Sequence, residues 1–239
     1  MGLLVLVRHG QAAFLSDDYD RLTPSGEAQA RTLGEFWAKQ RTVFDEVFTG
    51  SLVRQIRTAE LVGDQIRASG AAWPQAQVIQ GLDEYDGAAV MTALLPLLSR
   101  QGTRVNQLAE LYESSRGKPD EHKAFQRLFE AVTMAWIDGN ISPPGLRSWQ
   151  DFTNGVRQAI HQAVSGEGTG RRIVVFTSGG PISAAVQLAL GLSDRKTLEL
   201  NWQIRNCSLT EFLFSNNRLT LDRFNCLTHL PDRSQWTYR

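Results

Sequence analysis

The sequence predicts an α/β fold: a three-layer α/β/α sandwich with a mostly parallel central sheet. Residues Leu3–Val7 form a short apolar run with the length and the Leu/Val content of a fully buried parallel strand. Two further strand-like runs, Val43–Thr49 and Ile173–Thr177, are each followed by a turn of small residues and then by a helical pattern. The 239 residues, 42% of them hydrophobic, suffice for one large domain, which we place at 1–239.

The first predicted strand ends in Arg8, His9 and Gly10. Ligands bind at the carboxyl ends of strands in open α/β sheets, so this end is a candidate site. The arginine indicates an anion site, and the imidazole indicates a reactive or proton-handling group. A single histidine near a strand end is more often structural than catalytic, so the rest of the chain has to support this interpretation.

A polar loop over 11–21 and a helix come next. Thr23 is the expected N-cap of this helix, because its hydroxyl can accept from a free backbone N–H, and Pro24 suits the first helical position. The helix carries an apolar stripe at helical spacing, which predicts ordinary core packing. The stripe consists of Leu33, Phe36 and Trp37.

A second strand is predicted over Val43–Thr49, followed by a turn at Gly50 and a helix over Leu52–Ile66. This helix carries Arg54 and Arg57 in its first turns, so it brings a second cation near a strand's carboxyl end. An arginine on a helix is usually solvated. Two separate strand ends that both deliver arginine are stronger support for an anion site.

A third strand–turn–helix unit consists of Ile173–Thr177, the turn Ser178–Gly180, and a helix over Ile182–Leu192 with Pro181 at its first position. Free backbone N–H groups at the start of a helix form a ready anion cradle. This unit is therefore the third strand end with an anion-binding feature.

Between these units, Val78–Ile79 is expected to be a short strand, and Gly81–Gly87 contains the carboxylates Asp83, Glu84 and Asp86. A carboxyl beside an arginine-rich pocket can serve as a general acid. From about 88 to 147 the pattern is largely helical and lacks a Gly-rich ligand loop. We expect this region to be a helical cap inserted over the carboxyl ends of the strands, where insertions commonly determine specificity.

The last part of the chain begins with an amphipathic helix over Trp149–Val164. Strands over Arg205–Phe214 and Arg218–Phe224 are expected to pair as a hairpin through a turn at 215–217, and the tail from 225 is expected to be a loop. Cys207 and Cys226 lie in apolar, strand-like surroundings and lack disulfide-framework or metal-ligand spacing, so both are expected to be buried free thiols.

Lys+Arg and Asp+Glu both number 25, so no global field indicates nucleic acid or a membrane as a partner. The amino-terminal apolar run is too short for a signal peptide or a membrane span, and we expect a cytoplasmic protein. No metal site or cofactor is expected. The oligomeric state is left open, with a homodimer as one alternative.

Taken together, these segments resemble the histidine phosphatase superfamily, in its phosphoglycerate mutase-like branch. LVLVRHGQ resembles the nucleophile motif of that family, LTPSGEAQARTLG its first helix, and SLVRQIRTA its second arginine segment. GLDEYDG resembles the segment that bears the acid, and VVFTSGGPI resembles the second-histidine strand and turn. RNCSLTEF and FNCLTHL resemble the closing strands and tail. The region at about 88–147 has no recognisable counterpart.

The resemblance implies a phosphomonoester hydrolase for a small phosphorylated molecule. His9 would attack phosphorus and carry the phosphoryl group, with Arg8 and Arg54 binding the phosphate; the register of the motif favours Arg54 over Arg57. Glu84 would protonate the leaving oxygen and later assist water. The further phosphate-binding residues that the resemblance implies are Gln11, Thr23, Ser178 and Gly179.

The chain departs from the family pattern at the second catalytic histidine, where Ser178 stands. Serine can donate one neutral hydrogen bond but carries no charge, and loss of one electrostatic stabiliser can reduce a rate on the order of 10²–10³. His122 or His161 could in principle replace the missing imidazole in space.

Other departures concern single positions. Leu15 stands where many relatives have asparagine, and Gly87 follows Glu84 one residue early, so Asp83 and Asp86 remain alternatives for the acid. His229 matches a position in the family's tail that we interpret as structural.

Two further functions compete with a hydrolase. One is a catalytically impaired relative that binds a phosphorylated ligand or a protein partner, an alternative suggested by Ser178. The other is a phosphoglycerate-type mutase, which is less favoured because the chain lacks the long Arg/Lys/Tyr-rich stretch by which mutases hold a carboxylated phosphate.

Overall fold

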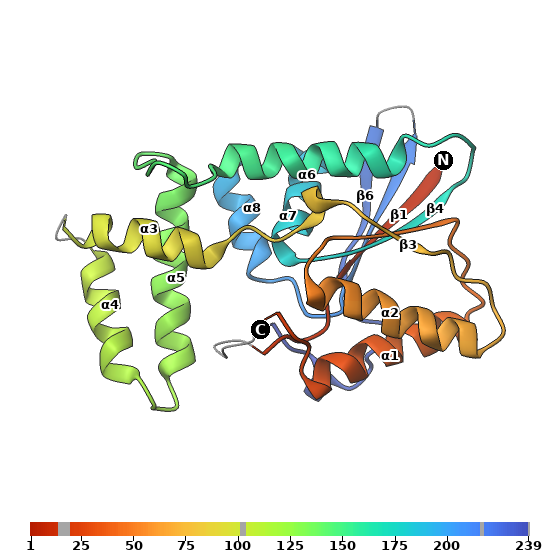
Figure 1. The fold of residues 1–239 in the computed structure, drawn as a ribbon, viewed down its shortest axis with the longest axis horizontal. Coiled ribbons are helices and arrows are strands. Elements are labelled where there is room, and N and C mark those ends of the chain that lie inside the picture. The colour runs from red at the N-terminus through yellow and green to blue at the C-terminus, as the bar shows by residue number, and fades with distance from the viewer. Residues whose placement is uncertain (14–19, 101–103, 216–217, 239) are drawn as a thin grey trace. The chain divides into compact units, whose positions relative to one another are not determined.

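The computed structural model describes residues 1–13, 20–100, 104–215 and 218–238. Six strands form one sheet in the order β3-β2-β4-β1-β5-β6, which confirms the predicted α/β fold with a mostly parallel sheet (Figure 1). The strands are β1 (Gly2–Arg8), β2 (Glu46–Thr49), β3 (Ala76–Val78), β4 (Arg172–Thr177), β5 (Leu209–Ser215) and β6 (Arg218–Cys226).

The helices in the described residues are α1 (Pro24–Lys39), α2 (Val53–Ala68), α3 (Gly87–Ser99), α4 (Arg104–Ser115), α5 (Glu121–Asp138), α6 (Trp149–Val164), α7 (Gly179–Leu190) and α8 (Asp194–Asn201). Two single-turn 3₁₀ helices are η1 (Gln80–Leu82) and η2 (Arg233–Gln235). The chain divides into two compact units: residues 1–84 with 154–239, and residues 85–153.

In the first unit, β3, β2, β4 and β1 run parallel, and β5 is antiparallel to β1. The register pairs Arg8 with Thr177, and Thr49 with Phe176. Strands β1, β2 and β4 therefore end almost level at one edge of the sheet, and their three following turns start side by side.

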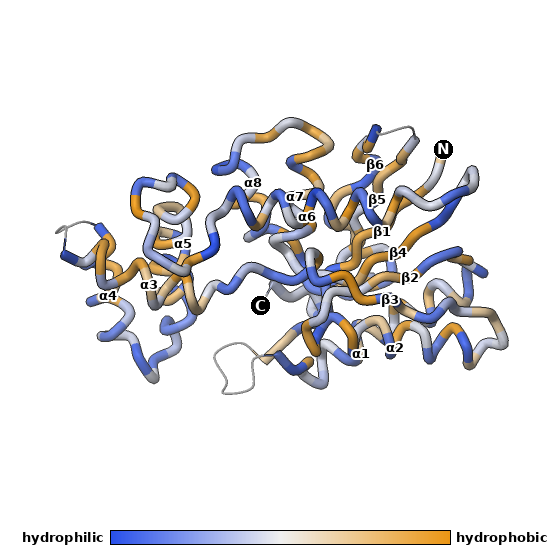
Figure 2. Tube along the Cα trace, turned by 45° about the horizontal axis from the view of Figure 1, so that its top comes forward, coloured by the Kyte–Doolittle hydropathy of each residue, from blue (hydrophilic) through white to orange (hydrophobic). Residues whose placement is uncertain are grey.

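Both faces of the sheet in this unit are apolar and covered, because residues that alternate along the strands are buried on either side. Val5, Val7 and Phe176 pack in one cluster with residues of α1 and α2 such as Leu33 and Val62. Leu4, Leu6 and Val175 point to the opposite face and are fully buried; α7 lies on this side (Figure 1). Figure 2 shows β1, β4 and β2 as the hydrophobic centre.

Several predicted elements are confirmed closely. Thr23 is the N-cap of α1, with its hydroxyl accepting from the Gly26 N–H, and Pro24 is the first helical residue. Helix α6 has the predicted bounds Trp149–Val164. The buried strand after Arg171 is present, one residue longer than predicted.

Other predicted bounds were wrong. Strand β2 begins at Glu46 rather than Val43, and the third strand is Ala76–Val78 rather than Val78–Ile79. The structure starts α7 at Gly179, because Ser178 already has the extended backbone of an N-cap residue. The short helix α8, capped by Ser193, was not predicted.

The predicted strand from Arg205 begins only at Leu209. Cys207 has a backbone φ of 59°, and the Ser208 N–H donates to the Arg205 carbonyl, so the chain turns here instead of extending. Cys207 is buried and free as predicted, although not in a strand, whereas Cys226 is free and only half-buried. The predicted hairpin turn includes residues 216–217, which lie outside the described residues.

The second unit, residues 85–153, contains α3, α4 and α5, and the expected cap boundaries of 88–147 fall inside it. Its aromatic side chains Tyr85, Trp136, Trp149 and Phe152 contact one another, with ring centroids 5.2–6.4 Å apart. That this unit caps the site stays a prediction. No helix in the described parts of the chain is long and apolar enough to span a membrane.

Candidate active site

The three strand ends that carry the predicted site residues are joined by hydrogen bonds. The His9 N–H donates to the Thr177 carbonyl (2.8 Å), and the Gly50 N–H donates to the Phe176 carbonyl (3.2 Å). The Gly10 N–H donates to the Thr58 hydroxyl of α2 (3.1 Å). The turns after β1, β2 and β4 therefore converge.

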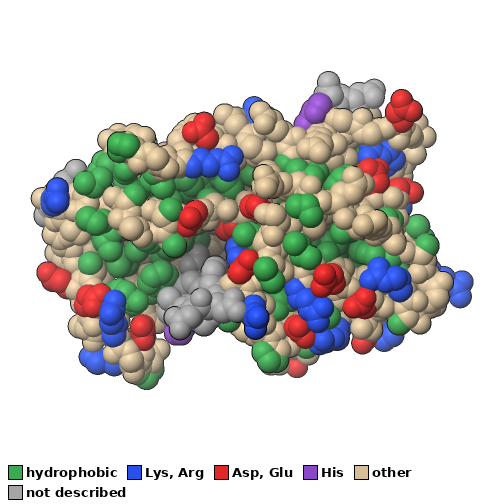
Figure 3. All heavy atoms as spheres, viewed as in Figure 1, with side chains coloured by type: hydrophobic (Ala, Val, Ile, Leu, Met, Phe, Trp, Pro, Cys, Tyr) green, Lys and Arg blue, Asp and Glu red, His purple; other side chains and the backbone are tan. Residues whose placement is uncertain are grey.

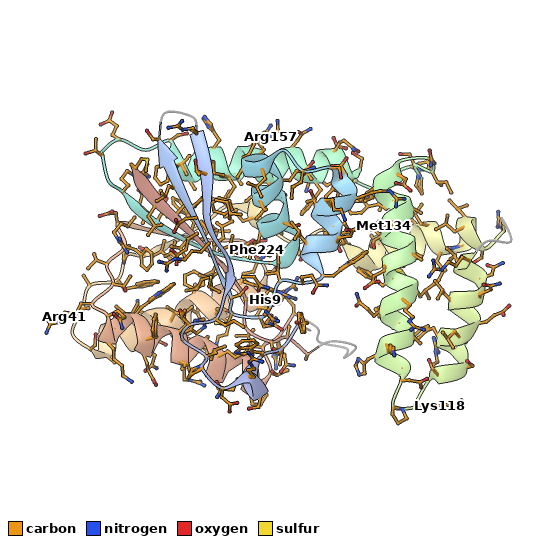
Figure 4. The ribbon with its side chains drawn as sticks, turned by 180° about the vertical axis from the view of Figure 1, so that it is seen from behind. His9, Arg41, Lys118, Met134, Arg157 and Phe224 are labelled. Atoms are coloured by element: carbon orange, nitrogen blue, oxygen red, sulfur yellow. The ribbon has the colours of Figure 1, made fainter. Side chains whose placement is uncertain are left out.

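His9 lies at this edge of the sheet, where β1 ends, and its side chain is buried (Figure 4). Its Nδ1 is 2.7 Å from the Gly10 carbonyl oxygen. A carbonyl oxygen only accepts, so Nδ1 bears the proton and Nε2 carries the lone pair. Burial, then the charges of Arg54 and Arg8, hold the pKa of His9 well below its ordinary value. The imidazole is therefore neutral near pH 7, as a nucleophile requires.

Arg54 is the residue that approaches the His9 lone pair. Its Nε lies 3.2 Å from His9 Nε2, and its Nη1 donates to Asp20 Oδ1 at 2.7 Å. Asp20 also accepts from the Val53 N–H at 2.8 Å and thereby caps the start of α2. The prediction named no role for Asp20, which appeared in the sequence as one of several acids in a polar loop.

Arg8 is buried and its Nη1 donates to the Ile204 carbonyl. The backbone beyond it is held by the segment before β5, since the Cys207 N–H donates to the His9 carbonyl at 3.1 Å. Arg57, the alternative to Arg54, instead pairs with Glu27 and Glu60 at the surface of the two helices. The structure thus brings Arg54 to His9 and directs Arg57 elsewhere.

The three carboxylates after η1 have different partners. Glu84 Oε2 accepts from the Gly180 N–H, at the start of α7, at 3.1 Å. Asp83 accepts from both the backbone N–H and the hydroxyl of Ser51, each at 2.5 Å. Asp86 caps α3 by accepting from the Ala89 N–H. Of these carboxylates, Glu84 is therefore the one that bonds to the turn after β4.

Ser178 and Gly179 lie in that turn. Ser178 is fully buried, and its Oγ accepts from Gln55 Nε2 at 2.9 Å. A Cβ added to Gly179 would lie 2.2 Å from Asn201 Oδ1, so the Asn201 side chain at the end of α8 would have to move to admit a larger residue here. Sequence reasoning missed Gln55, although it directly follows Arg54.

Gln11 and Thr23 meet at the start of α1. The Thr23 hydroxyl donates to Gln11 Oε1 (3.1 Å) while it caps the helix, and the Gln11 N–H donates to Gln29 Oε1 (2.9 Å). In this structure the Thr23 hydroxyl has a capping role and Gln11 as its partner. Phosphate binding by these two residues stays a prediction.

The other histidines have separate surroundings. His161 is exposed, bonds to Ser165, and lies near the end of α6 that leads to the amino end of β4, opposite the edge with His9. His122 is exposed on α5 in the second unit. His229 is buried against Phe36. Leu15 lies outside the described residues.

The surface over α1 and α2 carries acidic and basic side chains side by side (Figure 3). These pair in ion pairs such as Glu27 with Arg31 and Asp64 with Arg67. Within the described ranges, no three His, Cys, Asp or Glu side chains gather as a metal site would require.

Comparison with known proteins gives one family match and several relatives. The profile of the histidine phosphatase superfamily (branch 1) matches residues 4–92 and 88–227. The chain is 28% identical over 211 residues to a 2,3-bisphosphoglycerate-dependent phosphoglycerate mutase of Methylobacterium radiotolerans, covering 85% of each protein. A 68-residue stretch is 41% identical to 2-carboxy-D-arabinitol-1-phosphatase of Triticum aestivum, covering 26% of this chain and 13% of that protein.

Solved structures agree on the fold. A mycobacterial glucosyl-3-phosphoglycerate phosphatase superimposes with a TM-score of 0.63 at 20% identity, covering 95% of this chain and all of the other. A phosphoserine phosphatase from Entamoeba histolytica gives a TM-score of 0.61 at 17% identity, covering 96% of this chain and all of the other. At these identities the likeness establishes the architecture alone.

Proposed function

Because the chain belongs to branch 1 of the histidine phosphatase superfamily, we propose that it is a phosphomonoester hydrolase working through a phosphohistidine on His9. Its substrate would be a small phosphorylated molecule. The observation that carries this proposal is a buried, neutral imidazole whose Nε2 lone pair faces a guanidinium at 3.2 Å. That arrangement supplies a nucleophile and a phosphate-binding cation at one point.

In the first step, the Nε2 lone pair of His9 attacks phosphorus as the ester P–O bond breaks. The Arg54 N–H that faces Nε2 has to move to a phosphoryl oxygen, where a charge-assisted bond replaces the one it gives up. Arg8 and Arg54 neutralise the oxygen charge, which is most of what phosphoryl transfer requires. Glu84, as the carboxylic acid, donates its proton to the leaving oxygen.

In the second step, water attacks the phosphohistidine. The Glu84 carboxylate takes a proton from that water as the N–P bond breaks, and inorganic phosphate and the neutral imidazole are formed. The bond from the Gly180 N–H to Glu84 supports this assignment over Asp83 and Asp86. Ser178 would donate a neutral hydrogen bond in place of the family's second histidine, with a lower rate as the consequence.

The second candidate function is a relative that binds a phosphorylated ligand without efficient turnover. The specific observation in its favour is the buried hydroxyl of Ser178 where the family resemblance places an imidazole. A mutase is the third candidate, since the relative from Methylobacterium radiotolerans carries that name. The chemistry of the first step is common to hydrolase and mutase, which differ in the final phosphoryl acceptor.

Hydrolysis of p-nitrophenyl phosphate tests the proposal. The wild-type protein should release phosphate, and His9→Ala should lose this activity, whereas His161→Gln, on the surface of α6, should retain it. An alkaline quench during turnover should trap phosphate on His9. Phosphate binding without turnover across a broad panel of phosphoesters would favour the binding relative, and transfer from 2,3-bisphosphoglycerate to a phosphoglycerate would favour the mutase.

We also propose that residues 85–153 contribute to substrate choice. The support is chain connectivity, because Glu84 is followed directly by Tyr85, the first residue of the helical unit. Substitutions at exposed positions of α3–α5 should then change the ranking of phosphoesters in the panel while leaving p-nitrophenyl phosphate turnover within a few-fold.

A further inference from the structure

Gln55 is a fully buried amide that joins three segments of the site. Its Oε1 accepts from the Leu52 N–H (3.3 Å), in the segment that bears Arg54. Its Nε2 donates to the Leu82 carbonyl (3.1 Å), two residues before Glu84, and to Ser178 Oγ (2.9 Å). A buried amide needs its hydrogen bonds satisfied, so these contacts fix the side chain.

The orientation of the Gln55 amide follows from its partners. The Leu52 N–H can only donate, and the Leu82 carbonyl can only accept. Only one of the two amide orientations places an oxygen at the first and an NH₂ group at the second. The group facing Ser178 is therefore a donor, and the Ser178 oxygen has to accept from it.

The direction of the hydrogen bond from Gln55 to Ser178 determines which role remains for the Ser178 hydroxyl hydrogen. Because its oxygen accepts from Gln55, the hydroxyl has its own hydrogen left to donate, and no described residue accepts it. Ser178 is the N-cap residue of α7, and the Gly180 N–H in the first turn of that helix donates to Glu84, the proposed acid, so the hydroxyl lies beside the place where the phosphoryl group would react. A phosphoryl oxygen bound there is a suitable acceptor, and a hydroxyl that already accepts a bond donates a stronger one.

We infer that Gln55 is a positioning residue that directs the Ser178 hydroxyl toward the bound phosphoryl group. The inference rests on the proposed function for the identity of the ligand. A purely structural role for Gln55, in holding the three segments together, would act on stability and not through Ser178. The two roles differ in whether the effects of Gln55 and Ser178 depend on each other.

A double-mutant cycle separates these roles. Ser178→Ala, Gln55→Met and the double variant are compared in the dissociation constant for inorganic phosphate or vanadate, and in kcat/KM for p-nitrophenyl phosphate. One hydrogen bond to a charged oxygen corresponds to about a 10- to 100-fold loss in Ser178→Ala. Gln55→Met should lose a similar factor alone and nothing further when Ser178 is already alanine.

Gln187→Met is the matched control, because Gln187 also donates two hydrogen bonds, to the Leu192 carbonyl and to Asp194, at the far end of α7. Gln187→Met should change the melting temperature, but neither the dissociation constant for phosphate nor kcat/KM. If Gln55→Met does not fold, Gln55→Ala serves in the same cycle, assayed well below its melting temperature.

A histidine at position 178 gives an independent test. Gln55 Nε2 stands 2.9 Å from the Ser178 oxygen in a fully buried setting, so an imidazole has no room while Gln55 is present. Ser178→His should therefore be less stable and less active than wild type. Adding Gln55→Ala should restore both.

The inference would be overturned if the losses of the two single variants in phosphate affinity and kcat/KM simply multiplied in the double variant. It would also be overturned if Ser178→Ala bound phosphate as tightly as the wild type. Coupling in phosphate affinity without any turnover by the wild type would support the inference while overturning the proposed hydrolase. Turnover by the wild type, with independent effects of Gln55→Met and Ser178→Ala, would support the proposed hydrolase while overturning the inference.

Discussion

Acidification should destabilise this protein through His229, a residue outside the candidate site. The His229 side chain is buried, and neither ring nitrogen has a partner at normal hydrogen-bond geometry among the described residues. Burial lowers its pKa from 6.5 to about 4, with a smaller opposing effect of the Cys207 backbone. His229 therefore binds a proton more weakly in the folded protein than in the unfolded chain.

The sign and the size follow from this difference. Above pH 6.5 neither state binds the proton, so the full stability is present; as the pH falls, the unfolded state gains the proton first and stability is lost. Between pH 7 and pH 4.5 the loss from this one group is about 2 kcal/mol, at 1.36 kcal/mol for each unit of pKa difference. His9 shifts in the same direction and adds to the loss.

Urea denaturation at pH 7, 6, 5 and 4.5 measures the effect. His229→Leu should remove about 2 kcal/mol of the pH dependence, because leucine cannot titrate, while His9 remains as in the wild type. Phe36→Leu is the matched control, since it alters packing against the same ring and leaves the titrating group in place. Equal pH dependence of the wild type and His229→Leu would refute the reasoning.

Three further substitutions test the site and its scaffold. Asp20→Ala should lower the free energy of unfolding by about 1 kcal/mol, because α2 loses its cap, and should reduce kcat, because Arg54 loses a partner. Asp20→Asn should keep the stability. Urea titrations and hydrolysis kinetics of Asp20→Ala that match wild type would contradict this. Gly10→Ala would place a Cβ 2.3 Å from the Gly26 carbonyl oxygen, so we expect the free energy of unfolding to fall by roughly 1–3 kcal/mol and the activity to be impaired. An unchanged melting curve would contradict this expectation. Arg171→Met should cost roughly 3 kcal/mol, because it removes a buried guanidinium that pairs with the half-buried Glu46 and donates to three backbone carbonyls. The kcat of the folded protein should not change, because Arg171 lies at the amino ends of the strands, and a lower kcat at full folding would contradict this.

The fold and the convergence of the site were predictable from local patterns. Buried runs of Leu, Val and Ile predict strands, and parallel strands place their carboxyl ends at one edge, so His9, Arg54 and Ser178 were expected to approach one another. The structure brings them to this edge through backbone bonds between the turns.

The missed features depend on contacts between distant segments or on backbone geometry without a sequence signal. The hydrogen bond between Gln55 and Ser178 joins residues 123 positions apart, and the hydrophobic pattern of the sequence does not predict such a contact. Asp20 was one acid among several until the structure placed it on the first turn of α2. Cys207 adopts a positive φ that a sequence normally signals with glycine, so the start of β5 was predicted four residues early.

The hydrogen bonds of His9 also bear on its reactivity toward other molecules. Nδ1 donates to the Gly10 carbonyl, and Nε2 accepts from Arg54, so each nitrogen of the resting imidazole has a partner. Acylating reagents and transition-metal ions both require a free lone pair on such a ring. Under the proposed mechanism, a ligand whose own oxygens attract Arg54 would expose that lone pair, so His9 would become available for attack when an anion binds.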